Sequence, residues 1–390
     1  MKQNNPLQNL RLEFHILQSF PVSCLNRDDV GAPKTAIVGG TVRARVSSQA
    51  WKRPVRMTMH ELGSTHGTRT KLIARIIEDA CLERGATAEQ AKVCGESIER
   101  VFIKQKADED AANAKKAKKA KKAKEEEEID PSEEDSDSEK ADALLFLSPN
   151  EIEILGNVLK ESGFDPLKVI PEKDQKKQVK EVSDLIKKGA QSKVDALDIA
   201  LFGRMVAQAA ELNIESAASF SHAISTHKVS NEVEFFTALD DLQDDPGAAH
   251  MGSLEFNSAT YYRYVSLDLG QLAKTLAGQS LPEAVESFVH ALFVAIPSAR
   301  QSTQSAASPW EFAKVLVRRG QRLQVPFETA IKAKDGGFLQ PSIDFLTNYL
   351  SRQEKMHGSF FGKQSEYTYG LDENFSIDDL ITELKQHASV

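Results

Sequence analysis

The segment LRLEFHILQSF, residues 10–20, decides the fold class. Apolar and polar side chains alternate along it, with Leu12, Phe14 and Ile16 on one face and Arg11, Glu13 and His15 on the other. This period of two is typical of a strand that buries one face. A similar alternation at 42–46 predicts a second strand, and further strands are expected at 197–201, 222–229, 258–269 and 316–325.

Helices are indicated by capping signals between these strands. Ser148 with Glu151, and Ser280 with Glu283, form capping boxes, each with proline in the first helical turn. Helical patterns also cover 70–106, 172–189 and the segment after Pro341. Strands near both ends, separated by a long helical block, predict an α+β fold with a large helical insertion.

One further helix is expected after residue 46, with Ser47 or Ser48 as its N-cap. Pro54 lies inside this segment, and an interior proline removes one backbone hydrogen bond and crowds the preceding turn. The helix is therefore expected either to start near Pro54 or to bend there.

Composition excludes several protein classes. The 390 residues are 41% hydrophobic and 27% charged, as in an ordinary globular protein with a sizeable core. No apolar stretch approaches the roughly 18–20 residues that span a bilayer, and the first residues do not resemble a signal peptide. Three cysteines, Cys24, Cys81 and Cys94, lack the spacing of a metal site. We expect a cytoplasmic protein without membrane contact.

The net charge of −8 at first argues against nucleic-acid binding, but it is an average over the chain, and binding depends on local charge. Residues 107–142 are low in complexity, with seven lysines within 115–124 and an acidic block over 125–139. This composition cannot bury enough apolar surface to order itself, so a flexible insertion is expected. The rest of the chain can still supply a local basic patch.

Such a patch is indicated near the N-terminus. Seven cations fall within 30 positions, interleaved with hydroxyl and amide side chains: Arg27, Lys34, Arg43, Arg45, Lys52, Arg53 and Arg56. Cationic side chains neutralise phosphates without reading sequence, and the N–H groups of a helix start can position them. The alternative interpretation of this cluster is a solvated basic face.

Longer blocks of the sequence resemble one protein family. The strings SCLNRDDVGAPKTAIVGG (23–40) and RVSSQAWKRPVRM (45–57) are similar to the N-terminal signature of the CasC family, the backbone subunit of the type I-E CRISPR Cascade complex. The likeness continues in order through DIALFGRM (198–205), HAISTHKV (222–229), EFFTALDDLQ (234–243), AAHMGSLEFNSATYYRYVSLDLGQL (248–272) and AKDGGFLQPSI (333–343). The insertion at 107–142, Pro54 and the residues from Gln353 onward depart from the family pattern.

The resemblance implies a right-hand shape. A ferredoxin-like (RRM-like) palm would comprise residues 1–60, 190–222 and 246–350. Helical fingers that contain the insertion would comprise 61–189, a protruding thumb 223–245 and a tail 351–390. The implied partners are a CRISPR guide RNA, further copies of the chain, other Cascade subunits and target DNA reached through guide pairing. Copies would stack along the guide, and each thumb would press between nucleotides.

Site residues also follow from the resemblance. It places RNA contacts at Arg27, Lys34, Ser47, Ser48, Gln49, Lys52, Arg53, Arg56 and Arg204. No RNP1 signature is present, so side chains that wedge between nucleotides are expected elsewhere, at Met205, Phe235, Phe236 and Leu242. From composition alone, each of these four reads as ordinary core packing. Contact with DNA is expected from Lys115, Lys116, Lys118 and Lys119.

No catalytic constellation, metal site or cofactor motif is found, and no cofactor is expected. Asp28 and Asp29 are adjacent carboxylates that could bind a magnesium ion, which keeps a metal-dependent endoribonuclease as the rival interpretation. The plainer interpretation is that they orient Arg27 by a charge-assisted hydrogen bond or contact a neighbouring copy. A free-standing RNA-binding protein or chaperone is the third hypothesis.

Overall fold

The computed structural model describes residues 6–102, 145–171, 174–206, 209–237 and 251–389. The chain divides into two compact units, which are treated separately below. Unit 1 comprises Met1–Thr65, Ala200–Phe202 and Glu215–Val390, and unit 2 comprises His66–Ile199 and Gly203–Ile214. In the described part of the chain, no helix is both long and apolar enough to cross a membrane. The lysines Lys115, Lys116, Lys118 and Lys119, the rest of the 107–142 insertion and Leu242 lie outside the described residues.

Unit 1 is built around an antiparallel sheet. Its strands are β1 (Leu10–Ser23), β2 (Thr35–Val38), β3 (Thr41–Val46), β6 (Ala218–Phe220), β7 (Ala223–Ser225), β8 (Glu232–Thr237), β9 (Met251–Asp268), β10 (Phe312–Arg319) and β11 (Lys363–Tyr369). The order across the sheet is β11-β10-β1-β9-β7-β3-β2, and β6 and β8 pair with β9 beside this path. Its helices are α1 (Ser48–Glu61), α9 (Leu269–Thr275), α10 (Leu281–Val294), α11 (Gln301–Gln304), α12 (Leu339–His357) and α13 (Ile377–Gln386), with a 3-10 turn η2 (Gly358–Phe361).

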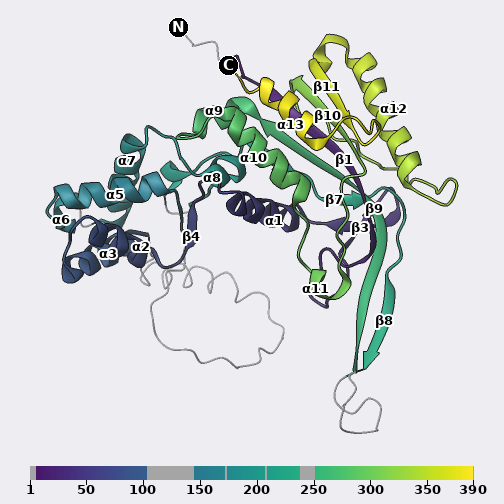
Figure 1. Ribbon diagram of the computed structural model, residues 1–390. Helices are drawn as coiled ribbons and strands as arrows, with labels where there is room; N and C mark the ends of the chain where they lie inside the picture. Colours follow the sequence, from purple (N-terminus) through teal and green to yellow (C-terminus); the bar gives the residue numbers. More distant parts are fainter. Residues whose placement is uncertain (1–5, 103–144, 172–173, 207–208, 238–250, 390) are drawn as a thin grey trace, which may run out of the picture. The chain divides into compact units, whose positions relative to one another are not determined.

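Helices cover both faces of this sheet. Adjacent residues of a strand point to opposite faces, and Tyr261 and Tyr262 of β9 accordingly join different cores. Tyr261 packs with Trp51 of α1, whereas Tyr262 packs with Leu346 of α12. Phe288 of α10 meets β1 on the same side as α1. Figure 1 shows α12 and β11 together at one end of the sheet.

The central position of β1 corrects one prediction. The alternation predicts an exposed polar face for this strand, but Glu13 and His15 are fully buried. Glu13 accepts hydrogen bonds from Tyr264 Oη (2.6 Å) and the Leu323 backbone N–H (2.9 Å), and it pairs with Arg318. Burial lowers the pKa of His15 to about 3. The α12 side therefore holds a buried polar network instead of solvent, in which His15 Nδ1 contacts Tyr262 Oη at 2.9 Å and His15 Nε2 has no partner.

Other strand predictions had mixed outcomes. The segments 42–46 and 258–269 form β3 and most of β9, while the strand expected at 222–229 shortens to β7 and the one at 316–325 ends at Arg319. The strand expected at 197–201 is wrong, because these residues form helix α8 (Leu197–Phe202). Leu197, Ile199, Ala200 and Leu201 are all buried. A short run buried on every side has no period that separates strand from helix.

Helix predictions are confirmed where caps signal them. Both capping boxes are present, at Ser148 and at Ser280. Helix α1 begins after its N-cap Ser47 and runs through Pro54, so it does not start there. Beyond residue 350, β11 extends the sheet next to β10, and α13 packs on α10. This stretch, assigned to a tail from the resemblance, thus belongs to unit 1.

Unit 2 is mainly helical. Its helices are α2 (Ile73–Glu83), α3 (Ala88–Phe102), α5 (Pro149–Glu161), α6 (Pro166–Val169), α7 (Gln175–Gly189) and the 3-10 turn η1 (Ala210–Leu212). A small pair of strands, β4 (Thr68–Thr70) and β5 (Leu145–Leu147), accompanies them. The buried faces of α2, α3, α5 and α7 share one apolar core.

Strands β8 and β9 form a hairpin that extends away from the rest of the sheet (Figure 1). Every residue of β8 is exposed. Its large side chains, among them Val233 and Phe235, therefore face outward. It includes part of the segment predicted to form the thumb.

Candidate nucleic-acid interface

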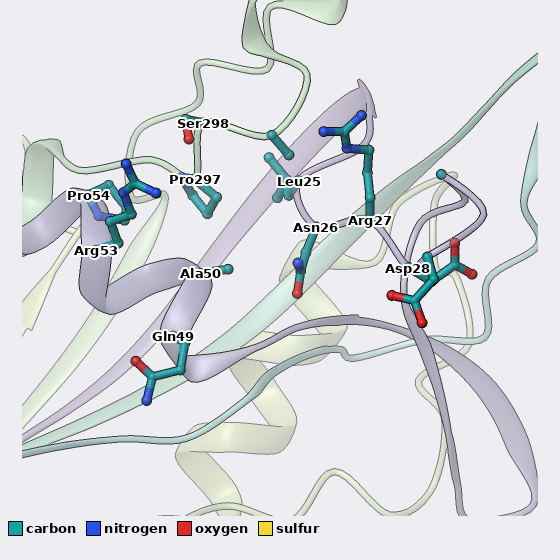
Figure 2. A pocket seen from close by; sticks show the side chains of 13 residues that line it. Leu25, Asn26, Arg27, Asp28, Gln49, Ala50, Arg53, Pro54, Pro297 and Ser298 are labelled. Carbon is teal, nitrogen blue, oxygen red and sulfur yellow. The ribbon is translucent and has the colours of Figure 1, made fainter. Parts of the chain in front are cut away.

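A groove of about 520 Å³ lies on the α1 side of unit 1. Three segments line it: the loop Leu25–Gly31, the start of α1 from Gln49 to Pro54, and the connection Pro297–Ala299 after α10. Figure 2 shows the Arg27 and Arg53 side chains extending from the loop and from α1, with Pro297 and Ser298 on a third segment. The groove thus combines sequence-distant parts of unit 1.

The first turn of α1 is fixed at this groove by hydrogen bonds. Ser47 Oγ accepts from the Ala50 backbone N–H (3.2 Å), as an N-cap does. The Ser47 N–H in turn donates to Asn26 Oδ1 (2.9 Å), which ties the helix to the loop. Gln49 and Arg53 are four residues apart and therefore share one helix face, and both are exposed.

A buried cation supports the opposite face of α1. The guanidinium carbon of Arg263 lies 3.6 Å from the ring centroid of Trp51, and Arg263 donates to Gln18 Oε1 (2.6 Å). Burial lowers the pKa of Arg263 to about 9, and no described carboxylate pairs with it. The Trp51 ring, Gln18 Oε1 and the Leu292 carbonyl (3.5 Å) therefore compensate this charge, and the ring contact couples α1 to the centre of the sheet.

The loop owes its shape to Asp28. Its Oδ1 accepts from the backbone N–H groups of Val30 (3.1 Å) and Ala32 (2.9 Å), and its own N–H donates to the Ala32 carbonyl (2.9 Å). Within the described residues, Arg27 forms no ion pair with Asp28 or Asp29, so the expected orientation of Arg27 by these carboxylates is not observed. Among those residues no group of three His, Cys, Asp or Glu could hold a metal ion.

Two of the predicted cations face the groove without a counter-ion. Arg27 and Arg53 are exposed, and no described carboxylate lies within ion-pair distance of either. Unpaired guanidinium groups beside a groove favour an anionic ligand that accepts planar, paired hydrogen bonds. A phosphate diester fits this requirement.

The other RNA contacts predicted in unit 1 differ from Arg27 and Arg53 in exposure or in position. Lys52 is half-buried with Nζ 5.8 Å from the Phe220 ring centroid, and burial lowers its pKa. Lys34, Ser48 and Arg56 are partly exposed but do not line the groove. Ser47 uses its hydroxyl as a cap, so within this set the groove itself brings together Arg27, Gln49 and Arg53.

Arg43, a member of the sequence cluster, is a structural residue. It is fully buried and donates to Thr41 Oγ1 and to the backbone carbonyls of Ser225, Phe327 and Glu328. Its neighbour in the cluster, Arg45, is more exposed and contacts His222 at 3.3 Å. The basic cluster therefore divides between core and surface.

Arg204 is likewise engaged inside unit 2. It pairs with Glu151 through two nitrogens, at 2.6 and 2.8 Å, and also donates to the carbonyls of Leu212 and Phe146. Both charged side chains are buried. These contacts occupy all three guanidinium nitrogens, which leaves Arg204 out of the interface we propose. The next residue, Met205, is 84% exposed.

The β8–β9 hairpin carries two aromatic side chains on opposite faces. Phe235 is 65% exposed and Phe236 is 36% exposed. Phe236 pairs with Gly252 across the hairpin, and a Cβ on Gly252 would lie 2.6 Å from Phe236 Cζ. The ring thus lies directly on the Gly252 backbone, where any side chain would displace it.

Comparisons with known proteins agree with this architecture. The profile of a family described as CT1975-like protein matches residues 12–378. The chain belongs to the CT1975-like protein family. This match confirms the family resemblance that the sequence indicated. No curated protein matched the chain.

Solved structures similar to this CT1975-like chain come from CRISPR assemblies. One chain, from a "CRISPR RNA-guided surveillance complex, pre-nicking", is 26% identical with a TM-score of 0.71, over 97% of this chain and 100% of that one. Another, from a "CRISPR RNA-guided surveillance complex", is 22% identical with a TM-score of 0.64 over the same shares and supports the fold alone. Both likenesses span nearly the whole CT1975-like chain.

Proposed function

We propose that this protein binds CRISPR guide RNA as a repeated backbone subunit of a type I-E Cascade complex. The observation that carries the proposal is a groove with unpaired Arg27 and Arg53 in a chain of the CT1975-like family. The similarity to a chain of an RNA-guided surveillance complex supports the same partner. Copies of the protein would assemble along the guide with other subunits and present it for pairing with target DNA.

The groove suits a ligand of any sequence. Arg27 and Arg53 offer guanidinium donors, and Gln49 offers an amide beside them. Contacts of this kind fix the position of a phosphate backbone and carry no base information. A protein that holds guides of many sequences requires this indifference.

Distortion of the guide is assigned to exposed apolar side chains. Phe235 and Phe236 project from the hairpin, and Met205 projects from unit 2. Apolar wedges of this type separate stacked bases and kink nucleic acids. We therefore propose that these side chains wedge between nucleotides of the guide.

The protein is proposed to be non-catalytic. One oxygen of Asp28 is occupied by two backbone N–H groups of its own loop, which gives this carboxylate a structural use. Phosphodiester cleavage assisted by a metal needs an ion held against the scissile phosphate, and often a second ion. Asp29 alone is a poor basis for such a site.

Sedimentation with a CRISPR transcript tests the proposal. We expect the protein to assemble with the transcript in discrete stoichiometric multiples, and to leave complementary RNA and DNA uncut in magnesium or manganese. Binding without discrete multiples would indicate a free-standing RNA-binding protein. Regularly spaced cuts that vanish in Asp28→Ala or Asp29→Ala would move the protein to the endoribonuclease class.

The wedge can be tested through the Phe236–Gly252 contact. Phe236→Ala is expected to weaken RNA binding by about 1–3 kcal/mol, the cost of removing one base stack. Gly252→Ala should cause a similar loss, because its methyl group displaces the ring. Chemical probing of the bound guide should then show less reactive, restacked nucleotides.

A double-mutant cycle separates this effect from general damage to the hairpin. If Gly252 acts only through the ring, Gly252→Ala added to Phe236→Ala should change binding no further. Ser253→Ala, on the neighbouring residue of β9, is the matched control and should bind as the unmodified protein does. Additive losses would mean that the contact does not position the wedge.

A further inference from the structure

One wall of the groove comes from a segment without any sequence motif. Pro297, Ser298 and Ala299 connect α10 to α11 and line the groove together with the Leu25–Gly31 loop. Arg300 follows directly and is partly exposed. Arg300 therefore adds a third positive charge next to a groove that Arg27 and Arg53 already line.

Contacts place the Arg300 guanidinium beside the loop. One of its terminal nitrogens lies 3.8 Å from the point that a Cβ on Gly31 would occupy. Gly31 has φ +93°, a conformation that favours glycine, so the loop passes the guanidinium without a side chain between them. Cys24 is also adjacent: burial raises the pKa of its thiol, and the nearby Arg300 charge, together with a side-chain hydrogen bond from Arg300, opposes that rise.

Arg300 differs from the buried arginines of the protein in what it binds. Arg43 and Arg204 have their guanidinium nitrogens engaged by carbonyl or carboxylate oxygens. Arg300 has no ion pair with any described carboxylate, and its Nε is buried without a hydrogen-bond partner. A buried donor without a partner is costly. Because Arg300 as a whole is partly exposed, an acceptor from solvent would reach its terminal nitrogens and not the buried Nε.

We propose that Arg300 is a third phosphate-binding guanidinium of this groove, acting with Arg27 and Arg53 on the guide-RNA backbone. The inference rests on the proposed function and adds the Pro297–Arg300 connection to its binding surface. Arg27 and Arg53 line the groove from the loop and from α1, whereas Arg300 lies at its edge, directly after the lining residue Ala299 and beside Gly31. A phosphate at this edge of the groove would then accept hydrogen bonds from more than one guanidinium group, in the planar geometry that these groups provide.

Titration of RNA binding against salt tests the inference. Arg300→Gln keeps most of the length of the side chain and removes its charge. We expect affinity to fall by about 10-fold or more for two guides of unrelated sequence. The slope of log affinity against log salt should become shallower by about 0.7, the value for one phosphate contact on a single strand. Arg300→Lys should keep the slope and lose part of the affinity, because it retains the charge without the planar fork.

Lys355→Gln is the matched control, since Lys355 is an exposed cation on α12 at the other face of the sheet. It should leave affinity and slope unchanged. An unchanged salt slope in Arg300→Gln, with or without a lower melting temperature of the RNA-free protein, would overturn the inference. Arg53→Gln distinguishes failure of this inference from failure of the proposed function. If Arg53→Gln makes the salt slope shallower while Arg300→Gln does not, only the role of Arg300 fails. If neither changes the slope, the groove is not the RNA site.

Discussion

Replacing Arg27 and Arg53 together by glutamate is expected to weaken guide-RNA binding at least 100-fold. A hydrogen bond to a charged group contributes about 1.5–3 kcal/mol, so removing two such bonds costs about 3–6 kcal/mol before any repulsion is counted. The salt slope should become shallower by about 0.7 for each phosphate that is no longer neutralised. Fluorescence anisotropy with a short labelled RNA, repeated over a range of salt concentrations, measures both quantities.

The matched control reverses two cations on the other face of the sheet. Arg352 and Lys355 lie exposed on α12, and their replacement by glutamate changes the net charge by the same amount. If this control weakened binding as much as the Arg27/Arg53 variant, the loss would reflect the overall charge of the protein. The groove would then have no special part in binding.

Glu151→Ala is expected to destabilise the protein by about 3–5 kcal/mol, because it leaves Arg204 buried without its counter-ion. The same substitution removes the N3 side chain of the α5 capping box, where Glu151 Oε2 accepts from the Ser148 N–H at 2.9 Å. Denaturant unfolding of the whole protein measures the loss. Glu153→Ala, an exposed position on the same helix, should change stability by less than about 0.5 kcal/mol.

The pair also distinguishes two roles for Arg204. Replacing both partners by apolar residues, as in Glu151→Leu with Arg204→Met, should cost much less than Glu151→Ala alone, because no charge is left buried. This double variant should bind guide RNA with unchanged affinity. A stable double variant that loses RNA binding would restore Arg204 to the interface predicted from the sequence.

The sequence predicted the fold best where an element depends only on residues close to it in the chain. The two capping boxes at Ser148 and Ser280 each depend on neighbours a few positions away, and each is present. The segment 197–201 failed for the opposite reason. Its burial on all sides comes from distant packing and erases the periodicity that a surface would impose.

The candidate site was predictable only in part, for the same physical reason. Arg27, Arg43 and Arg53 belong to one cluster of cations, and the RNA contacts that the resemblance implies included Arg27 and Arg53 but not Arg43. Arg43 is buried and donates to the carbonyls of Phe327 and Glu328, 284 and 285 positions away. No local feature marks that difference. The Pro297–Arg300 connection carried no motif at all, and it reaches the groove only because the chain returns to the α1 side after α10.

Strand β9 has mechanical consequences for the hairpin. Its residues up to Phe256 pair with β8, and from Asn257 onward they pair with β1, with a register shift between Asn257 and Ala259. The hairpin is therefore anchored at one end, where β9 pairs with β1 in the middle of the sheet, and is free of the sheet at its other end. A force on Phe235 or Phe236 is transmitted along β9 to the buried rings of Tyr261 and Tyr262, because β9 continues from the hairpin into the sheet without a loop. A hairpin anchored in this way is expected to hold Phe235 and Phe236 at a fixed position relative to the sheet.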